Sequence, residues 1–425
     1  MRAAVPAHSP RMYHVGQHRV QQQVRGALQT RDRDARLRRL QQVMHSSRFH
    51  VKDIQNKELV TLAVVETADL KQRLRSFQMP VKVSEPCKIN KDTRGRAEKR
   101  GDYKWLMRAN DEPDRAARRA IKDLTERAIE CRSYAIGTAE TVCLKHVDGM
   151  LAGTKLISPS MGEWPKEFIK KTSLKNLTIT VEKAVVFEVA RRKALAGRHV
   201  VAVNAASAYH IGGGFSTGGR HALEESMCVQ STLYNSLLRG SQLAEEAGVT
   251  APDWVQPPSR RTGGEWMMHI PDDGAVLSPC VEVFRGGTLD GYPFEDVPAL
   301  LEAVVSVAMP NCNDRMSDSP VDAHPDGDEY YAQLKRKWQT VLTAAAEYTK
   351  AKTLVIPDCG CGVFRNPPEQ VGLALGELLR EVFVNAFEEV IIAFPGGKNG
   401  ETFAEHVSAA FESRPAETGP SAYRG

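Results

Sequence analysis

The chain has 425 residues and 42% of them are hydrophobic, so it is long enough for one large domain with an appendage or for two domains. No stretch approaches the roughly 18 uninterrupted apolar residues of a membrane span, which excludes a membrane partner. Eight cysteines are too few and too irregularly spaced for the disulfide framework of a secreted protein, which favours an intracellular compartment.

The net charge of +5 is unevenly distributed along the chain. Residues 1–100 carry 22 Lys+Arg and 9 Asp+Glu, a balance of +13, which leaves 35 against 43, or −8, for the other 325 residues. The first 31 residues contain no acid and no continuous apolar core, as in a basic tail or an organelle transit peptide. We expect residues 1–104 to be a basic, partly disordered N-terminal extension and linker, either contacting a polyanion or simply solvated.

From residue 105 onwards, helical and strand-like apolar periodicities alternate, and this alternation is typical of an α/β domain. We expect this domain to span residues 105–411, with a flexible tail over 412–425. The expected helices are 112–135, 187–197, 224–239, 330–351 and 367–383. The expected strands are 177–183, 198–206, 304–310, 353–359 and 388–394.

Two polar stretches interrupt this pattern. Residues 241–264 lack periodicity and predict a surface excursion, and the acid-rich residues 313–329 predict a solvated loop rather than a metal site. Cys359 and Cys361 form a C-x-C pair with no second pair at zinc-finger spacing. We therefore expect no metal and no cofactor.

A glycine-rich stretch, "NAASAYHIGGGFSTGGRHALEES" (204–226), follows the expected strand 198–206. Glycine permits positive φ and lets backbone N–H groups approach an anion, which is how many loops hold phosphate. The dinucleotide fingerprint G-x-G-x-x-G fails because Thr217 stands where its third glycine would be, and the P-loop fails because Arg220 and His221 follow Gly219. A purely structural tight turn remains the alternative.

Two further features favour a ligand. Adjacent acids, Glu224 and Glu225, stand just beyond the glycines at an expected helix start. A second loop, "CGCGVFRNPPEQ" (359–370), also follows an apolar strand and precedes a helix that begins with two prolines. Two such loops at strand ends predict a ligand with a diphosphate, bound at the carboxyl edge of the sheet, and Phe215 and Phe364 are candidate aromatic faces for its base or ribose.

These residues resemble the microbial-type poly(ADP-ribose) glycohydrolases. That family has Asn-Phe-Ala-Ser-Ala, three glycines and then Gln-Glu-Glu, followed later by Ser-Pro-x-Val-x-Val-Phe-Arg and Gly-Cys-Gly-Val-Phe-x-Asn-Pro-Pro. "SPCVEVFRG" (278–286) resembles the second of these motifs and "CGCGVFRNPP" the third, and the resemblance extends from about Arg132 to Phe411. It implies a three-layer, macrodomain-like α/β fold in which helices flank a mixed sheet.

The resemblance also implies an activity, a partner and a set of site residues. The activity is metal-free hydrolysis of the ribose–ribose O-glycosidic bond of poly(ADP-ribose), and the partner is that polymer or an ADP-ribosylated protein. Glu225 would be the catalytic acid/base and Glu224 would orient a ribose hydroxyl. The implied ligand-binding residues are Asn204, Gly212, Gly213, Gly214, Gly362, Val363 and Phe364, and Phe215 is added to them as the other candidate aromatic face.

The chain departs from the family pattern at several positions. Leu223 stands where the family has Gln, Ala205 replaces Phe, and Tyr209, His210 and Ile211 precede the glycines in place of Asn-Pro. Two other functions stay open: a non-catalytic macrodomain reader that only binds ADP-ribose, and an unrelated nucleotide-binding α/β protein. Adjacent carboxylates argue against a reader, because they repel a dianionic diphosphate.

Overall fold

A computed structural model describes the chain over residues 81–83, 96, 102–108, 111–136, 140–161, 177–255, 267–316 and 319–413. The expectations for residues 1–80 and for the tail after 413 therefore lie outside the described residues. The chain divides into two units, residues 1–77 and 78–425, and all described residues belong to the second. Within the expected extension, β1 (Val81–Val83) pairs in parallel with β2 (Ser133–Ile136), so part of that segment joins a sheet.

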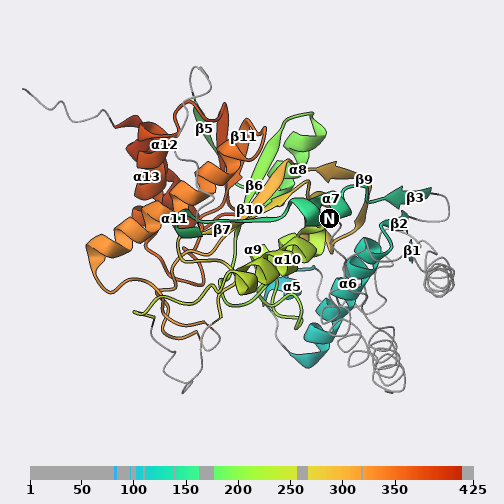
Figure 1. Cartoon of the computed structure of the whole chain (residues 1–425). Helices are drawn as coiled ribbons and strands as arrows, with labels where there is room; N and C mark the ends of the chain where they lie inside the picture. The colour runs from blue at the N-terminus through green and yellow to red at the C-terminus, as the bar shows by residue number, and fades with distance from the viewer. Residues whose placement is uncertain are drawn as a thin grey trace, which may run out of the picture. The chain divides into compact units, whose positions relative to one another are not determined.

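A seven-stranded mixed sheet forms the centre of the described unit (Figure 1). Its order is β4 (Lys155–Ile157), β7 (Ala275–Pro279), β10 (Ala303–Val307), β6 (Val200–Ala205), β11 (Thr353–Ile356), β12 (Glu389–Ala393) and β5 (Thr178–Glu182). The five strands from β10 to β5 run parallel, whereas β7 is antiparallel to both of its neighbours. Parallel neighbours place the carboxyl ends of β10, β6 and β11 at one edge of the sheet.

Helices cover both faces of this sheet, which gives three layers. One face carries α6 (Glu112–Glu130), α7 (Val147–Gly153), α8 (Val186–Leu195), α9 (Leu223–Gln230) and α10 (Leu233–Glu246). The other carries α11 (Gly327–Glu347), α12 (Pro368–Glu381) and α13 (Lys398–Glu412). In β6, Ala202 is buried among the first group and Val203 among the second, as expected for a strand buried on both sides. The expected three-layer, macrodomain-like α/β fold is confirmed.

The other elements are short. They are α5 (Trp105–Arg108), β3 (Glu140–Cys143), β8 (Glu282–Arg285), β9 (Phe294–Leu300) and the 3₁₀ turns Pro159–Met161 and Thr288–Asp290. A small sheet has the order β1-β2-β3, and β8 pairs antiparallel with β9. The helix expected over 112–135 ends at Glu130, because the following residues enter β2, where Tyr134 is fully buried. Tertiary packing overrides the helical periodicity there.

The single helix expected over 224–239 is two helices, α9 and α10. Ser231 separates them and forms an antiparallel bridge with Val283. Its hydroxyl donates to the Met227 carbonyl (2.8 Å) and accepts the Leu233 N–H (3.2 Å), so the break carries its own hydrogen bonds. The surface excursion expected from residue 241 begins later, since α10 continues to Glu246, and residues 256–266 lie outside the described part.

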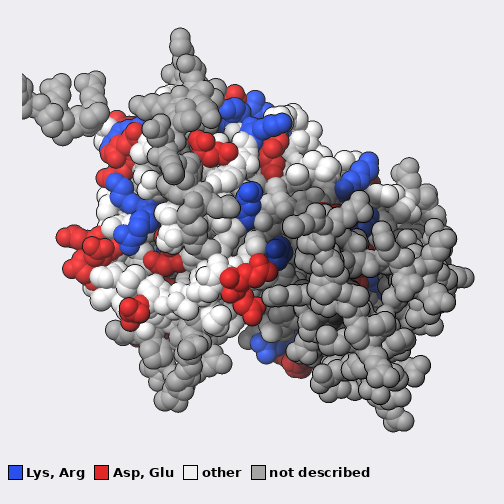
Figure 2. Space-filling model, in the orientation of Figure 1, with Lys and Arg blue, Asp and Glu red and all other residues white. Residues whose placement is uncertain are grey.

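The acid-rich stretch 313–329 is solvated in part, as expected, since Asp314, Arg315 and residues 325–329 are exposed. Asn313, Ser319 and Asp322 are buried, and Asp322 accepts a hydrogen bond from the hydroxyl of Tyr209 (3.1 Å). Among the described residues, no group of His, Cys, Asp and Glu side chains is placed to hold a metal ion. None of the described helices is long and apolar enough to cross a membrane. On the coloured part of the face in Figure 2, acidic and basic side chains are interspersed.

Candidate active site

The loops that follow β6, β10 and β11 meet at the carboxyl edge of the sheet. Together with the first turn of α9 they surround a cavity of about 700 Å³. This is the position at which open α/β sheets bind their ligands, because the chain leaves β6 toward one face and β10 and β11 toward the other, which opens a crevice between the loops. The predicted site residues that line the cavity are Gly213, Gly214, Glu224, Glu225, Gly362, Val363 and Phe364.

The glycine loop folds directly onto the Glu225 carboxylate. The Gly214 N–H donates to Glu225 Oε1 (2.7 Å) and the Ala222 N–H donates to Oε2 (3.0 Å). Gly213 has φ +57°, and a Cβ added there would collide with Glu225 Oε1. The loop therefore uses glycine at 213 because the backbone is left-handed and the carboxylate occupies the space of a side chain.

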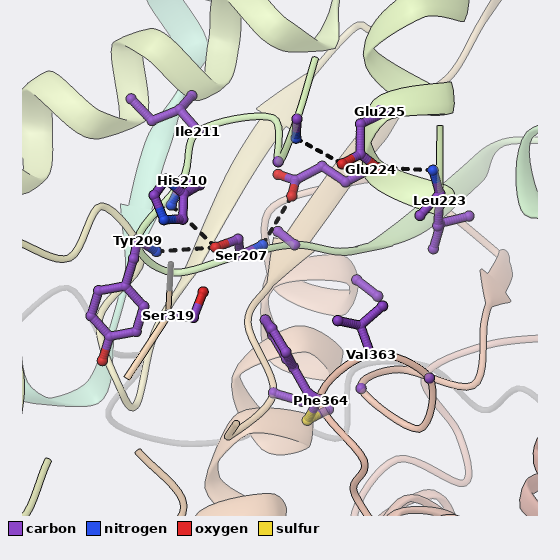
Figure 3. Close-up of a pocket in the computed structure, with 18 of the residues that line it drawn as sticks. Ser207, Tyr209, His210, Ile211, Leu223, Glu224, Glu225, Ser319, Val363 and Phe364 are labelled. Carbon is purple, nitrogen blue, oxygen red and sulfur yellow. Dashed lines mark hydrogen bonds between the residues drawn. The ribbon is translucent and has the colours of Figure 1, made fainter. Parts of the chain in front are cut away.

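Glu224 lies beside Glu225 at the first turn of α9, as Figure 3 shows. It is 5% exposed, and one of its oxygens accepts the Ser207 N–H (3.0 Å). Burial and the neighbouring Glu225 charge hold the pKa of Glu224 well above its usual range, although hydrogen bonds from Ser207, Gly212 and Asn204 oppose this shift. The position thus shifts the Glu224 carboxyl group toward its protonated form.

The pKa of Glu225 is also raised, and burial is the main cause. The hydrogen bonds from Gly214 and Ala222 and the charge of Arg118 act in the opposite direction. Glu224 is buried and Glu225 is half-buried, and two such adjacent carboxyl groups lose their protons one after the other as a coupled pair, so one proton is retained well above the ordinary range for glutamate. The site combines a proton donor with a carboxylate.

Arg118 fixes the far end of the glycine loop from α6. Its Nε donates to the Gly218 carbonyl (2.8 Å), and the side chain is fully buried. On the same turn, Gly214 and Gly219 approach so closely that a Cβ on Gly214 would lie 2.8 Å from the Gly219 Cα. The loop is therefore tied both to the domain and across its own base.

The second loop, residues 359–366, forms the opposite wall (Figure 3). Asn366 Nδ2 donates to the carbonyls of Gly360 (2.9 Å) and Pro310 (2.8 Å), and Asn313 Nδ2 donates to the Val363 carbonyl (2.8 Å). These bonds join the loop after β11 to the loop after β10. They leave Val363 and Phe364 facing the acids across the cavity.

Comparisons with known proteins agree with this geometry. Residues 123–286 match the family model described as microbial-type PARG, catalytic domain. This part of the chain is similar to the catalytic domain of the microbial-type poly(ADP-ribose) glycohydrolases (PARGs).

Solved PARG structures from Thermomonospora curvata share the fold. The enzyme itself is 26% identical with a TM-score of 0.54, and the alignment covers 70% of this chain and 100% of that chain. A Glu-to-Ala mutant and a complex with the inhibitor ADP-HPD are both 27% identical, with TM-scores of 0.53 and 0.51. Each of these alignments covers 68% of this chain and 99% of the other. A search of curated proteins gives no match.

Three of the expected ligand-binding residues lie behind the cavity wall. Phe215 is 1% exposed and packs against Tyr234 with ring centroids 4.6 Å apart, so it belongs to the core and offers no face to a base. Gly212 lies against the same tyrosine ring. Asn204 is fully buried at the end of β6, where it bonds Ser306 (3.1 Å) and faces Glu224.

The sequence patterns missed several residues that line the cavity. Tyr209, Ser207 and Asp358 all contribute to the wall. Burial raises the pKa of Asp358 to about 6. The position of Asp358 directly after a strand end was the available signal, because residues at that edge converge on the site.

Proposed function

We propose that this protein hydrolyses the ribose–ribose O-glycosidic bonds of poly(ADP-ribose) and releases ADP-ribose, with Glu225 as the acid/base. The observation that carries the proposal is the pair of the buried Glu224 and the half-buried Glu225 at the wall of a cavity that two glycine loops complete. The inhibitor-bound T. curvata enzyme is the relative that supports a ligand of the ADP-ribose type.

The roles follow from the chemistry of glycoside cleavage. The departing oxygen needs a proton, and the oxocarbenium-like transition state gains from nearby negative charge. The raised pKa of Glu225 increases its protonated fraction at neutral pH, as a general acid requires. After donating its proton to the leaving oxygen, the Glu225 carboxylate would take a proton from the attacking water.

The hydrogen bonds to Glu225 are compatible with this cycle. Each carboxylate oxygen accepts one backbone N–H, from Gly214 or Ala222, and each keeps a second lone pair. The backbone donors fix the carboxyl group without occupying the lone pair that must carry the catalytic proton. Glu224, held by Ser207, would bind a ribose hydroxyl next to the scissile bond.

The two glycine loops would hold the diphosphate. Backbone N–H groups in such loops point at an anion and require no cationic side chain. The residues that line the cavity include neither lysine nor arginine in the described part of the chain, so backbone dipoles are the main source of attraction there. Gly213 and Gly214 lie on one wall, and Gly362, Val363 and Phe364 lie on the other.

The decisive test is release of ADP-ribose from labelled poly(ADP-ribose) by the wild type and by Glu225→Gln. We expect release by the wild type and a large loss in the variant, while Glu245→Gln, an exposed acid on α10, retains full activity. The affinity of each protein for ADP-ribose is measured by calorimetry alongside the release assay. Binding without release by the wild type would identify a reader instead, and equal release by Glu225→Gln would remove Glu225 from the role.

We also propose that the basic N-terminal region assists capture of the polyanionic chain by neutralising its phosphates. Its balance of +13 over residues 1–100 motivates this step. Deletion of residues 1–77, at the boundary between the two units, leaves β1 and its pairing with β2 intact. The truncated protein should bind long chains more weakly and with a smaller salt dependence, and unchanged salt dependence would contradict the proposal.

A further inference from the structure

The helix that carries the acid pair lacks the usual side-chain cap at its start. α9 has only eight residues, and its N-cap residue, Ala222, has no side chain that can bond the free N–H groups of the first turn. The Glu225 carboxylate bonds the Ala222 N–H itself. Something other than a cap must therefore fix the position of α9.

We infer that Tyr292 is a positioning residue for the acid pair, holding α9 through its hydroxyl on both sides of Glu224 and Glu225. The inference rests on the proposed function and extends it to a residue outside the cavity. The Tyr292 hydroxyl lies 2.9 Å from His221 Nδ1 and 3.2 Å from Ser226 Oγ. His221 precedes the start of the helix and Ser226 follows Glu225 directly, so one oxygen binds both flanks of the first turn.

The hydrogen-bond capacity of the hydroxyl is fully used. Thr288 Oγ1 is its third neighbour, at 2.8 Å, and Thr288 also contacts Ser226 Oγ at 3.1 Å. A phenol hydroxyl donates one hydrogen and accepts two, which equals the number of its partners. The four side chains thus form one closed network behind the first turn.

This network stays uncharged around neutral pH. Burial, together with the charges of Arg118 and Arg285, lowers the pKa of His221 to about 3, and burial raises the pKa of Tyr292. The charged groups that face these two residues are Arg118, Arg285 and Glu225. Because neither His221 nor Tyr292 titrates in the working range, the hold on α9 does not change while the acid pair exchanges protons.

Tyr292 is itself held in an unusual backbone conformation. Its φ is +57°, in the left-handed region that large side chains rarely adopt, and its side chain is fully buried. Arg285 Nε donates to the Tyr292 carbonyl (3.0 Å), and the Tyr292 N–H donates to Gly287 O (3.1 Å). Such a backbone conformation is kept only where contacts with the surrounding structure hold it in place, which is common next to functional sites.

Arg285 connects Tyr292 to the rest of the domain. It is fully buried, its Nη1 donates to the Ile121 carbonyl of α6 (3.1 Å), and its guanidinium lies 4.2 Å from the centre of the Phe294 ring. The segment 278–286 contributes no residue to the cavity lining. Through Arg285 it nevertheless fixes the position of Tyr292. Its arginine places the tyrosine, and the tyrosine places the acids.

The test compares Tyr292→Phe with Tyr134→Phe. Tyr134 is equally buried, and its hydroxyl donates to a backbone carbonyl, that of Glu295, at 2.6 Å. Both variants lose one buried hydroxyl and keep the ring, so both should lower the melting temperature. We expect only Tyr292→Phe to reduce kcat, by about tenfold or more, with the Kd for ADP-ribose changed less than about twofold. Equal kcat values for the two variants would overturn the inference.

A second pair of variants separates positioning from folding. His221→Asn can place an amide where Nδ1 lies, whereas His221→Leu cannot, so kcat should recover in the first and remain low in the second. Equal kcat in both would contradict the role of the hydrogen bond. Hydrogen exchange over residues 221–230 gives a readout independent of activity, and faster exchange is expected in Tyr292→Phe than in Tyr134→Phe.

The exchange measurement also separates this inference from the proposed function. A wild type that releases no ADP-ribose would refute the function, and the exchange data would still decide the inference. Unchanged exchange over residues 221–230 in Tyr292→Phe would overturn the inference even in an active enzyme.

Discussion

Replacing Gly213 by alanine tests whether the glycine loop exists to accommodate the Glu225 carboxylate. Gly213 has φ +57°, and an added Cβ would collide with Glu225 Oε1 and approach Cδ to 3.0 Å. The left-handed conformation costs alanine about 1–2 kcal/mol. The carboxylate must also retreat by about 1 Å to reach ordinary contact, which weakens its charge-assisted bond to the Gly214 N–H by about 1.5–3 kcal/mol. We expect a total loss of about 2.5–5 kcal/mol in the free energy of unfolding.

Gly197→Ala is the matched control, because Gly197 has φ +80° but nothing within 4 Å of an added Cβ. It should lose only the 1–2 kcal/mol of conformational strain and retain full activity. Urea unfolding gives the two stabilities, and ADP-ribose release from labelled chains gives the rates. A displacement of about 1 Å at the reacting group predicts a roughly hundredfold lower kcat for Gly213→Ala. If the two variants have the same stability and the same kcat, the carboxylate does not dictate the glycine.

Two further predictions concern the pH dependence of the acids. Burial raises the folded-state pKa of Glu224, so its contribution to stability is lost as pH rises from about 4.5 through that raised value. Glu224→Gln should therefore melt at a higher temperature than the wild type at pH 7.5 but not at pH 4. A lower melting temperature of the variant at pH 7.5 would contradict the raised pKa. Asp358 lines the cavity with a pKa of about 6, so its charge repels a diphosphate at pH 7.5 but not at pH 5. Asp358→Asn should therefore bind ADP-ribose more tightly than the wild type only at the higher pH. Equal calorimetric affinities of variant and wild type at pH 7.5 would refute the repulsion.

The sequence predicted the fold where strands and helices are long and their periodicity is unambiguous. All five expected strands exist, because apolar runs such as 198–206 lie in a sheet buried on both faces. The break between α9 and α10 was not predictable, because Ser231 forms its bridge with Val283, a partner 52 residues away in the chain. Local pattern carries no information about such a contact.

The sequence predicted those parts of the candidate site that lie on loops following strands. The glycines of the two loops and the acid pair predicted two walls of the cavity, because each of these patterns reflects what the local backbone requires. Phe215, one of the two candidate aromatic faces, is buried, because an aromatic residue next to a glycine loop packs inward as readily as outward. Tyr292 left no signal in the sequence, since its importance depends on His221 and Ser226, which approach it only in the folded chain.

The distribution of charge in the cavity connects ligand binding to protonation. Glu224, Glu225 and Asp358 line it, and none of its described lining residues is a lysine or an arginine. A diphosphate entering such a site adds negative charge close to groups whose pKa values burial has already raised. Its approach must raise them further, so binding favours uptake of a proton. In the proposed mechanism that proton is the one a leaving glycosidic oxygen requires, so the repulsion that weakens binding would also supply the catalytic acid.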